Sequence, residues 1–134
     1  MPRALLVDDE PGIRIALKRW FERQGFVVIE AADGNLALAL LFATDDVEDT
    51  PDVIVCDIHL PGISGDKLLA RLSVERPVLA ARVILTTGDA VDDAGPGSVL
   101  ASHPFVLQKP FELVTLKTMV EQVRVAALRD MFAT

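Results

Sequence analysis

The chain has 134 residues, 51% of them hydrophobic and 25% charged, which is enough apolar material for the core of a single domain spanning residues 1–134. Thirteen basic and twenty acidic residues give a net charge of −7, and no cluster of Lys or Arg offers a surface for nucleic acid, so we expect no direct binding to nucleic acid. The longest apolar run, residues 36–43, is too short to cross a membrane, Cys56 is the only cysteine, and the chain does not start with a signal-peptide pattern. We therefore expect a cytoplasmic protein that has no internal disulfide and no membrane contact.

Short runs rich in Val, Ile and Leu alternate with longer stretches of helical periodicity. The predicted strands are residues 3–7, 27–30, 52–56, 82–86 and 105–108. Most of these runs are apolar almost throughout, as in strands that helices cover on both faces. The pattern predicts an α/β fold with a doubly wound, five-stranded parallel sheet.

The gaps between the strands predict helices. They cover residues 11–24, residues 34–44, a stretch that begins near Ser64, residues 98–102, and residues 113 to about 129. The first helix should bury a stripe formed by Ile13, Ala16, Leu17 and Trp20. The fourth should be only a turn or two, because few helices tolerate the Gly-Pro-Gly sequence at residues 95–97.

Polar residues stand where four of the predicted strands end. They are Asp8 and Asp9 after the first strand, Asp57 after the third, Thr87 after the fourth and Lys109 after the fifth. The carboxyl ends of parallel strands meet at one edge, and with the strand order 2-1-3-4-5 the order reverses between the first and third strands. The three carboxylates should therefore meet at the point where such sheets bind ligands.

Carboxylates gathered in this way repel one another unless a cation neutralises them. Oxygen ligands without His or Cys partners favour Mg²⁺. A carboxylate can also act as a nucleophile toward phosphorus, and Asp57 is the best candidate because its strand is central. Lys109 and Thr87 could then bind phosphoryl oxygens, by charge and by a hydrogen bond respectively.

Four motifs now indicate a family. Leu5-Leu6-Val7-Asp8-Asp9-Glu10, Val53-Ile54-Val55-Cys56-Asp57 with Leu60-Pro61-Gly62 and Gly65, Thr87-Gly88, and Lys109-Pro110-Phe111 occur in this order. Together they resemble the receiver domain of two-component response regulators, over residues 3 to about 125. The resemblance implies a flavodoxin-like receiver fold with strand order 2-1-3-4-5. The stretches around Thr87 and Lys109 look more like those of receivers attached to hybrid histidine kinases than like those of receivers fused to DNA-binding domains, which implies a receiver of the hybrid-histidine-kinase or stand-alone type.

The resemblance also implies roles for the acidic residues. Asp57 would accept the phosphoryl group, and Asp8 and Asp9 would hold Mg²⁺ together with Asp57 and the backbone carbonyl of His59. Asp9 would be a direct metal ligand, whereas Asp8 would act largely through water.

Two further residues would respond to phosphorylation, with Thr87 as the switch hydroxyl and Lys109 as the conformational lysine. The family usually has an aromatic switch residue three positions before the lysine, where this chain has Val106.

We expect the protein to be a phosphorylation-dependent switch or phosphorelay carrier rather than an enzyme. Its partners would be a histidine kinase or a histidine phosphotransfer protein, a downstream protein target, and a second copy if the apolar residues Leu128, Met131 and Phe132 form a dimer surface. One alternative is a phosphorylation-independent interaction module, which usually lacks the acidic residues that are present here. Another is a Mg²⁺-dependent aspartyl-phosphate phosphatase, but such enzymes commonly have a second Asp two positions after the nucleophile, where this chain has His59.

Overall fold

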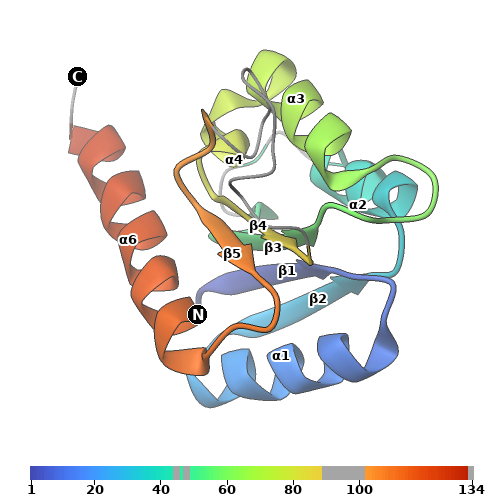
Figure 1. Ribbon diagram of the computed structural model, residues 1–134. Helices are drawn as coiled ribbons and strands as arrows, with labels where there is room; N and C mark the ends of the chain where they lie inside the picture. Colours follow the sequence, from blue (N-terminus) through green and yellow to red (C-terminus); the bar gives the residue numbers. More distant parts are fainter. Residues whose placement is uncertain (44–45, 47–48, 89–101, 133–134) are drawn as a thin grey trace.

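Strands and helices alternate along the chain (Figure 1). The structure is a computed structural model, and it describes residues 1–43, 46, 49–88 and 102–132. The strands are β1 (Arg3–Val7), β2 (Val27–Ala31), β3 (Val53–Asp57), β4 (Val83–Thr87) and β5 (Val106–Gln108). The helices are α1 (Pro11–Arg23), α2 (Gly34–Leu41), α3 (Gly65–Glu75), α4 (Pro77–Ala80) and α6 (Leu113–Phe132).

The five strands form one parallel sheet in the order β2-β1-β3-β4-β5, which confirms the predicted fold class and strand order. The chain leaves β1 in one direction to reach β2 and then crosses back in the other direction to reach β3. Because crossovers between parallel strands are right-handed, this reversal places α1 and α2 on opposite faces of the sheet. The order therefore reverses at β1 and β3, where Asp8 and Asp57 are located.

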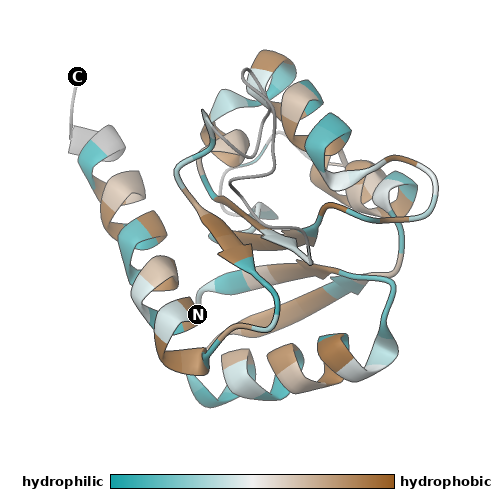
Figure 2. Cartoon of the chain, in the orientation of Figure 1, coloured by the Kyte–Doolittle hydropathy of each residue, from teal (hydrophilic) through white to brown (hydrophobic). Residues whose placement is uncertain are grey.

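Each face of the sheet has its own apolar core. On one face, α1 and α6 pack on the strands through Leu17, Phe21, Leu116, Val120 and Val123. On the other face, α2, α3 and α4 pack on the strands through Ala37, Leu38, Leu41, Leu68, Leu69, Leu72, Leu79 and Ala80. Figure 2 shows the hydrophobic residues along the strands and on the helix faces that meet them. The central strands β3 and β4 are buried along their whole length, so they hold the groups at their ends firmly in place.

The side of α1 that is buried differs from the predicted one. Leu17 and Phe21 are its buried residues, whereas Trp20 is only partly buried and Ala16 is exposed. Phe21 lies edge-on to Trp20 and to Phe26, with ring centroids 4.9 and 5.1 Å apart. The chain returns after Gly25, which has a φ of 88°, and this turn places Phe26 against Phe21.

Several element boundaries also differ from the prediction. Strands β3 and β4 each begin and end one residue later than predicted, so Asp57 and Thr87 are the last residues of their strands. Pairing continues because Asp57 lies opposite Thr86 and Ile58 N donates to Thr86 O at 3.0 Å. Helix α2 ends at Leu41, three residues before the predicted end, and α6 extends three residues beyond its predicted end at 129.

One short helix, α4, was not predicted. Pro77 fits the first turn of this helix, and its residues Leu79 and Ala80 are buried in the core. The predicted turn at 98–102 and the Gly-Pro-Gly at 95–97 lie outside the described residues, apart from Ser102. Among the described residues, no helix combines the length and the apolar character needed to cross a membrane.

Gly65, the first residue of α3, lies against the backbone at the end of β3. Its N–H donates to the carbonyl oxygen of Ile58 at 2.8 Å. A Cβ atom at this position would collide with the backbone carbonyl of Asp57. The loop after Asp57 can therefore turn back over the strand only if residue 65 has no side chain.

We predict that Gly65→Ala destabilises the protein by about 1–3 kcal/mol, because the added methyl must displace backbone in a packed region. The matched control is Gly12→Ala in α1, where a Cβ meets nothing within 4 Å. That control should leave stability unchanged or raise it by up to about 1 kcal/mol. Urea unfolding measures both free energies, and equal stability of the two variants would contradict the predicted collision.

Candidate functional site

The predicted site residues lie at the carboxyl ends of the strands. Asp8 follows β1, Asp57 ends β3, Thr87 ends β4 and Lys109 follows β5. Asp8 and Asp57 are 3% and 5% exposed, so two carboxylates are buried at the same edge. We call this edge of the sheet the rim.

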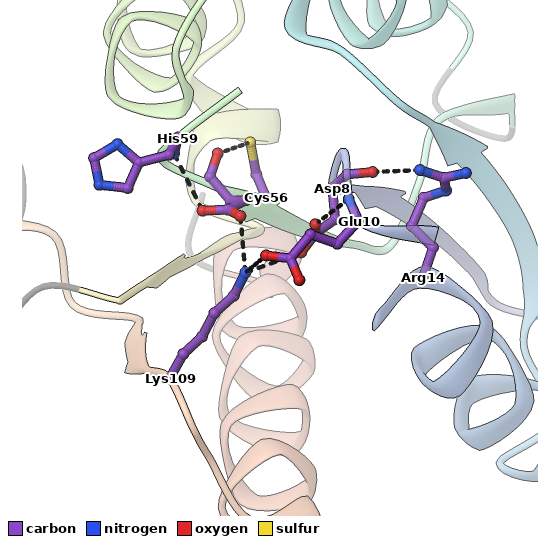
Figure 3. A network of polar contacts seen from close by, with 7 residues as sticks. Asp8, Glu10, Arg14, Cys56, His59 and Lys109 are labelled. Carbon is purple, nitrogen blue, oxygen red and sulfur yellow. Dashed lines mark hydrogen bonds and ion pairs between the residues drawn. The ribbon is translucent and has the colours of Figure 1, made fainter. Parts of the chain in front are cut away.

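Lys109 links the two buried carboxylates (Figure 3). Its Nζ lies 2.8 Å from Asp57 Oδ2 and 3.2 Å from Asp8 Oδ2, and Glu10 Oε1 is at 4.0 Å. Burial alone would lower the pKa of Lys109, but the hydrogen bonds and charges of Asp57 and Asp8 outweigh it, so this pKa is raised. The lysine therefore stays charged and binds both carboxylates. The Lys109–Pro110 peptide bond that follows is cis.

The second oxygen of each buried carboxylate accepts a backbone hydrogen bond. His59 N donates to Asp57 Oδ1 at 3.1 Å, and Glu10 N donates to Asp8 Oδ1 at 2.9 Å. His59 thus meets Asp57 through its N–H, while its exposed imidazole ring points away from the carboxylates (Figure 3). Four contacts fix the two carboxylates in orientation, which is the preorganisation that a reactive carboxylate needs.

Four acidic residues converge at the rim, and we call them the acid cluster. Asp8, Asp9, Glu10 and Asp57 each offer a carboxylate oxygen, and these oxygens all lie within 4.8 Å of one another. Asp9 and Glu10 are exposed, so the cluster opens to solvent on their side. A set of oxygen donors without His or Cys fits Mg²⁺. Glu10 is the member of the acid cluster that the sequence motifs do not predict as a site residue, although it stands directly after the two aspartates.

Thr87 is fully buried at the end of β4. Its carbonyl oxygen accepts a hydrogen bond from Lys109 N at 2.6 Å, so the backbone of the two residues is joined. Val106, at the position of the usual aromatic switch residue, is only partly buried and packs against the core that α2, α3 and α4 cover. The structure thus places Thr87 and Lys109 next to each other, as the strand order requires.

Cys56 precedes Asp57 but points into the core. It is fully buried, and burial, followed by the charges of Asp57 and Asp8, raises the pKa of its thiol far above the ordinary value. A thiol in this state is a poor nucleophile.

The Response regulator receiver domain family matches residues 4–121 of the chain. A curated relative, sporulation initiation phosphotransferase F of Bacillus subtilis, is 29% identical over 120 residues, which are 90% of this chain and 91% of that protein. The chain spans only 33–48% of several other curated relatives, which are regulators of transcription by name.

Solved structures agree with this match. Response regulator protein TrrA from Thermotoga maritima, in complex with Mg²⁺ and beryllofluoride, has a TM-score of 0.76 and 30% identity over 92% of this chain and 99% of that chain. A CheY-like receiver domain protein from Methanospirillum hungatei has a TM-score of 0.81 and 25% identity over 97% of this chain and 98% of that chain. The family match agrees with the strand order of the sheet and with the four carboxylates and one lysine at the rim. The chain therefore belongs to the receiver-domain family of response regulators.

Proposed function

We propose that this receiver domain accepts a phosphoryl group on Asp57 and signals by protein contact. The observation that carries the proposal is the ion pair between Lys109 Nζ and Asp57 Oδ2, at 2.8 Å, inside the acid cluster. Asp57 is the member of the cluster that lies at the end of a fully buried central strand. It therefore combines a fixed position with a cation that can later bind a phosphoryl oxygen.

The acid cluster would hold the Mg²⁺. Asp9, Asp57 and the carbonyl of His59 are the proposed ligands, Asp8 acts largely through water, and Glu10 adds a further carboxylate at the open side. The ion would neutralise charge on the incoming phosphoryl oxygens. A relative, TrrA, has been solved in complex with Mg²⁺ and beryllofluoride, which supports this assignment.

The transfer itself is a displacement at phosphorus. A carboxylate oxygen of Asp57 forms the new P–O bond, and the P–N bond to a phosphohistidine of the donor breaks. The phosphohistidine ring carries a proton on its other nitrogen, so the imidazole leaves with the electron pair of the P–N bond as a neutral ring. Lys109, already charged, binds an oxygen of the transferred group, so the developing negative charge meets a cation that needs no proton.

The donor would be a histidine kinase or a histidine phosphotransfer protein. An apolar groove of about 570 Å³ lies between α1 and the segment after β5, with Ile13, Ala16, Phe111 and Leu113 in its lining. Lys109 lines this groove and its ammonium also contacts Asp57, so one residue joins the groove to the phosphoacceptor. We call it the α1 groove and assign it to the protein that delivers the phosphoryl group.

We propose that the domain is a phosphoacceptor rather than an enzyme on small substrates. The residue two positions after Asp57 is His59, whose ring points away from the carboxylates (Figure 3), so no second acid stands there to protonate a leaving group. The retained acid cluster also favours this function over a phosphorylation-independent interaction module. The dimer surface proposed at the end of α6 includes Leu128, which is 55% exposed, whereas the side chains of Met131 and Phe132 lie outside the described part of the chain.

Incubation with Mg²⁺ and a small phosphodonor such as acetyl phosphate should add one phosphoryl group, detected by mass spectrometry of the intact protein. Peptide mapping should place it on Asp57, and Asp57→Asn should remove it. Asp52→Asn, in the segment before β3 and away from the rim, is the matched control and should be modified like the wild type. Modification of Asp57→Asn at the wild-type level would rule out the acceptor assignment.

The α1 groove generates a second prediction. Ala16→Gln places a polar side chain on this exposed apolar lining without adding charge, so transfer from a phosphorylated donor protein should slow by about tenfold, the effect of roughly 1.4 kcal/mol. Phosphorylation by acetyl phosphate should not change, because a small donor needs no groove. Ala70→Gln, on the exposed face of α3, is the matched control. Equal rates of protein-to-protein transfer in the two variants would argue against this docking surface.

A further inference from the structure

Arg14 of α1 contacts the backbone of the acid cluster from outside it (Figure 3). Its Nη1 donates to the backbone carbonyl oxygen of Asp8 at 2.7 Å. Its Nε lies 3.6 Å from Oε1 of Glu30 in β2, and the Arg14 side chain is 19% exposed. One guanidinium therefore joins the loop that carries Asp8 and Asp9 to both α1 and β2.

Asp9 depends on this loop for its position. Among the described residues its carboxylate makes no hydrogen bond and no ion pair, although it contributes an oxygen to the acid cluster. Asp8, in contrast, is held at several points: its N–H donates to Ala31 O at 3.2 Å and its carboxylate binds Lys109. The remaining backbone polar group of Asp8 is its carbonyl, which belongs to the Asp8–Asp9 peptide and accepts the hydrogen bond from Arg14. Because the peptide unit is planar, fixing this carbonyl also fixes the direction in which the chain enters Asp9.

We propose that Arg14 is a positioning residue for Asp9, acting through the Asp8–Asp9 peptide, with Glu30 as its anchor. The inference rests on the magnesium site of the proposed function. Mg²⁺ demands near-ideal octahedral geometry, so a ligand on a loosened loop binds it less well. Groups that orient metal ligands without touching the metal have a large influence on affinity for this reason.

The positive charge of Arg14 should change the Mg²⁺ affinity in the direction opposite to its positioning effect. A guanidinium near the cluster repels a divalent cation, so removal of its charge alone should strengthen Mg²⁺ binding or leave it unchanged. Positioning and charge therefore predict changes of opposite sign, and a substitution at Arg14 can separate them.

Lys18 provides the matched control. It lies on the same helix, carries the same charge and pairs with the same anchor, with Nζ 3.7 Å from Glu30 Oε2. Lys18 forms an ion pair with Glu30, whereas Arg14 in addition donates a hydrogen bond to the Asp8 carbonyl. Lys18→Ala thus reports the loss of a charge and of a contact to Glu30, without the loss of the backbone contact.

The test is calorimetric titration of Mg²⁺ into the wild type, Arg14→Ala, Arg14→Lys and Lys18→Ala, with thermal unfolding of each protein as a measure of folding. Arg14→Ala should bind Mg²⁺ about tenfold more weakly than the wild type. Arg14→Lys should recover part of that loss, because an ammonium can reach the Asp8 carbonyl but lacks the fork that also meets Glu30. Lys18→Ala should bind as tightly as the wild type or slightly more tightly.

Arg14→Ala binding as tightly as Lys18→Ala would overturn the proposal. If Arg14→Ala does not fold, Arg14→Lys decides: wild-type affinity in that variant overturns the proposal, and binding weaker by about threefold supports it. A wild type that does not bind Mg²⁺ would contradict the magnesium site itself, and this result is distinguishable because it appears before any variant is compared.

Discussion

The ion pair between Lys109 and the carboxylates of Asp57 and Asp8 is the interaction on which the rim depends. Two carboxylates that are 3% and 5% exposed lose most of their contact with water, and burying an unpaired ion costs several kcal/mol. Lys109 offsets part of this cost with hydrogen bonds of 2.8 and 3.2 Å. The pair is possible because parallel strands end at the same edge and because β5, which leads to Lys109, lies on the same side of β1 as β3.

A single ammonium does not neutralise the acid cluster. The formal charges of the four acids and of Lys109, −4 and +1, leave a net charge of −3. The excess negative charge favours a divalent cation, and it also opposes an approaching phosphoryl group until such a cation is bound. Lys109 in addition donates its backbone N–H to Thr87 O and lines the α1 groove. A change in what its side chain binds at Asp57 would therefore alter a residue that also lines the groove proposed for the donor protein.

Much of the fold and of the site could be predicted from the sequence because the informative residues sit at strand ends. Apolar runs marked β1, β3 and β4, and the polar residues at their ends, Asp8, Asp57 and Thr87, had to share an edge once the sheet was parallel. Boundaries were less predictable: Asp57 belongs to β3 because pairing with β4 continues, and local composition does not show this. The stripe of α1 was turned because Phe21 packs on Phe26 across the turn at Gly25, a contact between separate elements. Arg14 carried no signal in the sequence, since its acceptor at Asp8 is a backbone carbonyl.

The charge state of Lys109 tests the central claim most directly. An NMR titration of the lysine side-chain resonances in the metal-free protein should give Lys109 a pKa above the ordinary value of 10.5, because Asp57 and Asp8 stabilise its charged form against the effect of burial. The stability that the ion pair contributes should then be complete below 10.5 and should be lost as the pH rises through the raised pKa. Saturation with Mg²⁺, which competes for the same carboxylates, should lower this pKa. A Lys109 pKa at or below 10.5 in the metal-free protein, unchanged by Mg²⁺, would contradict the account.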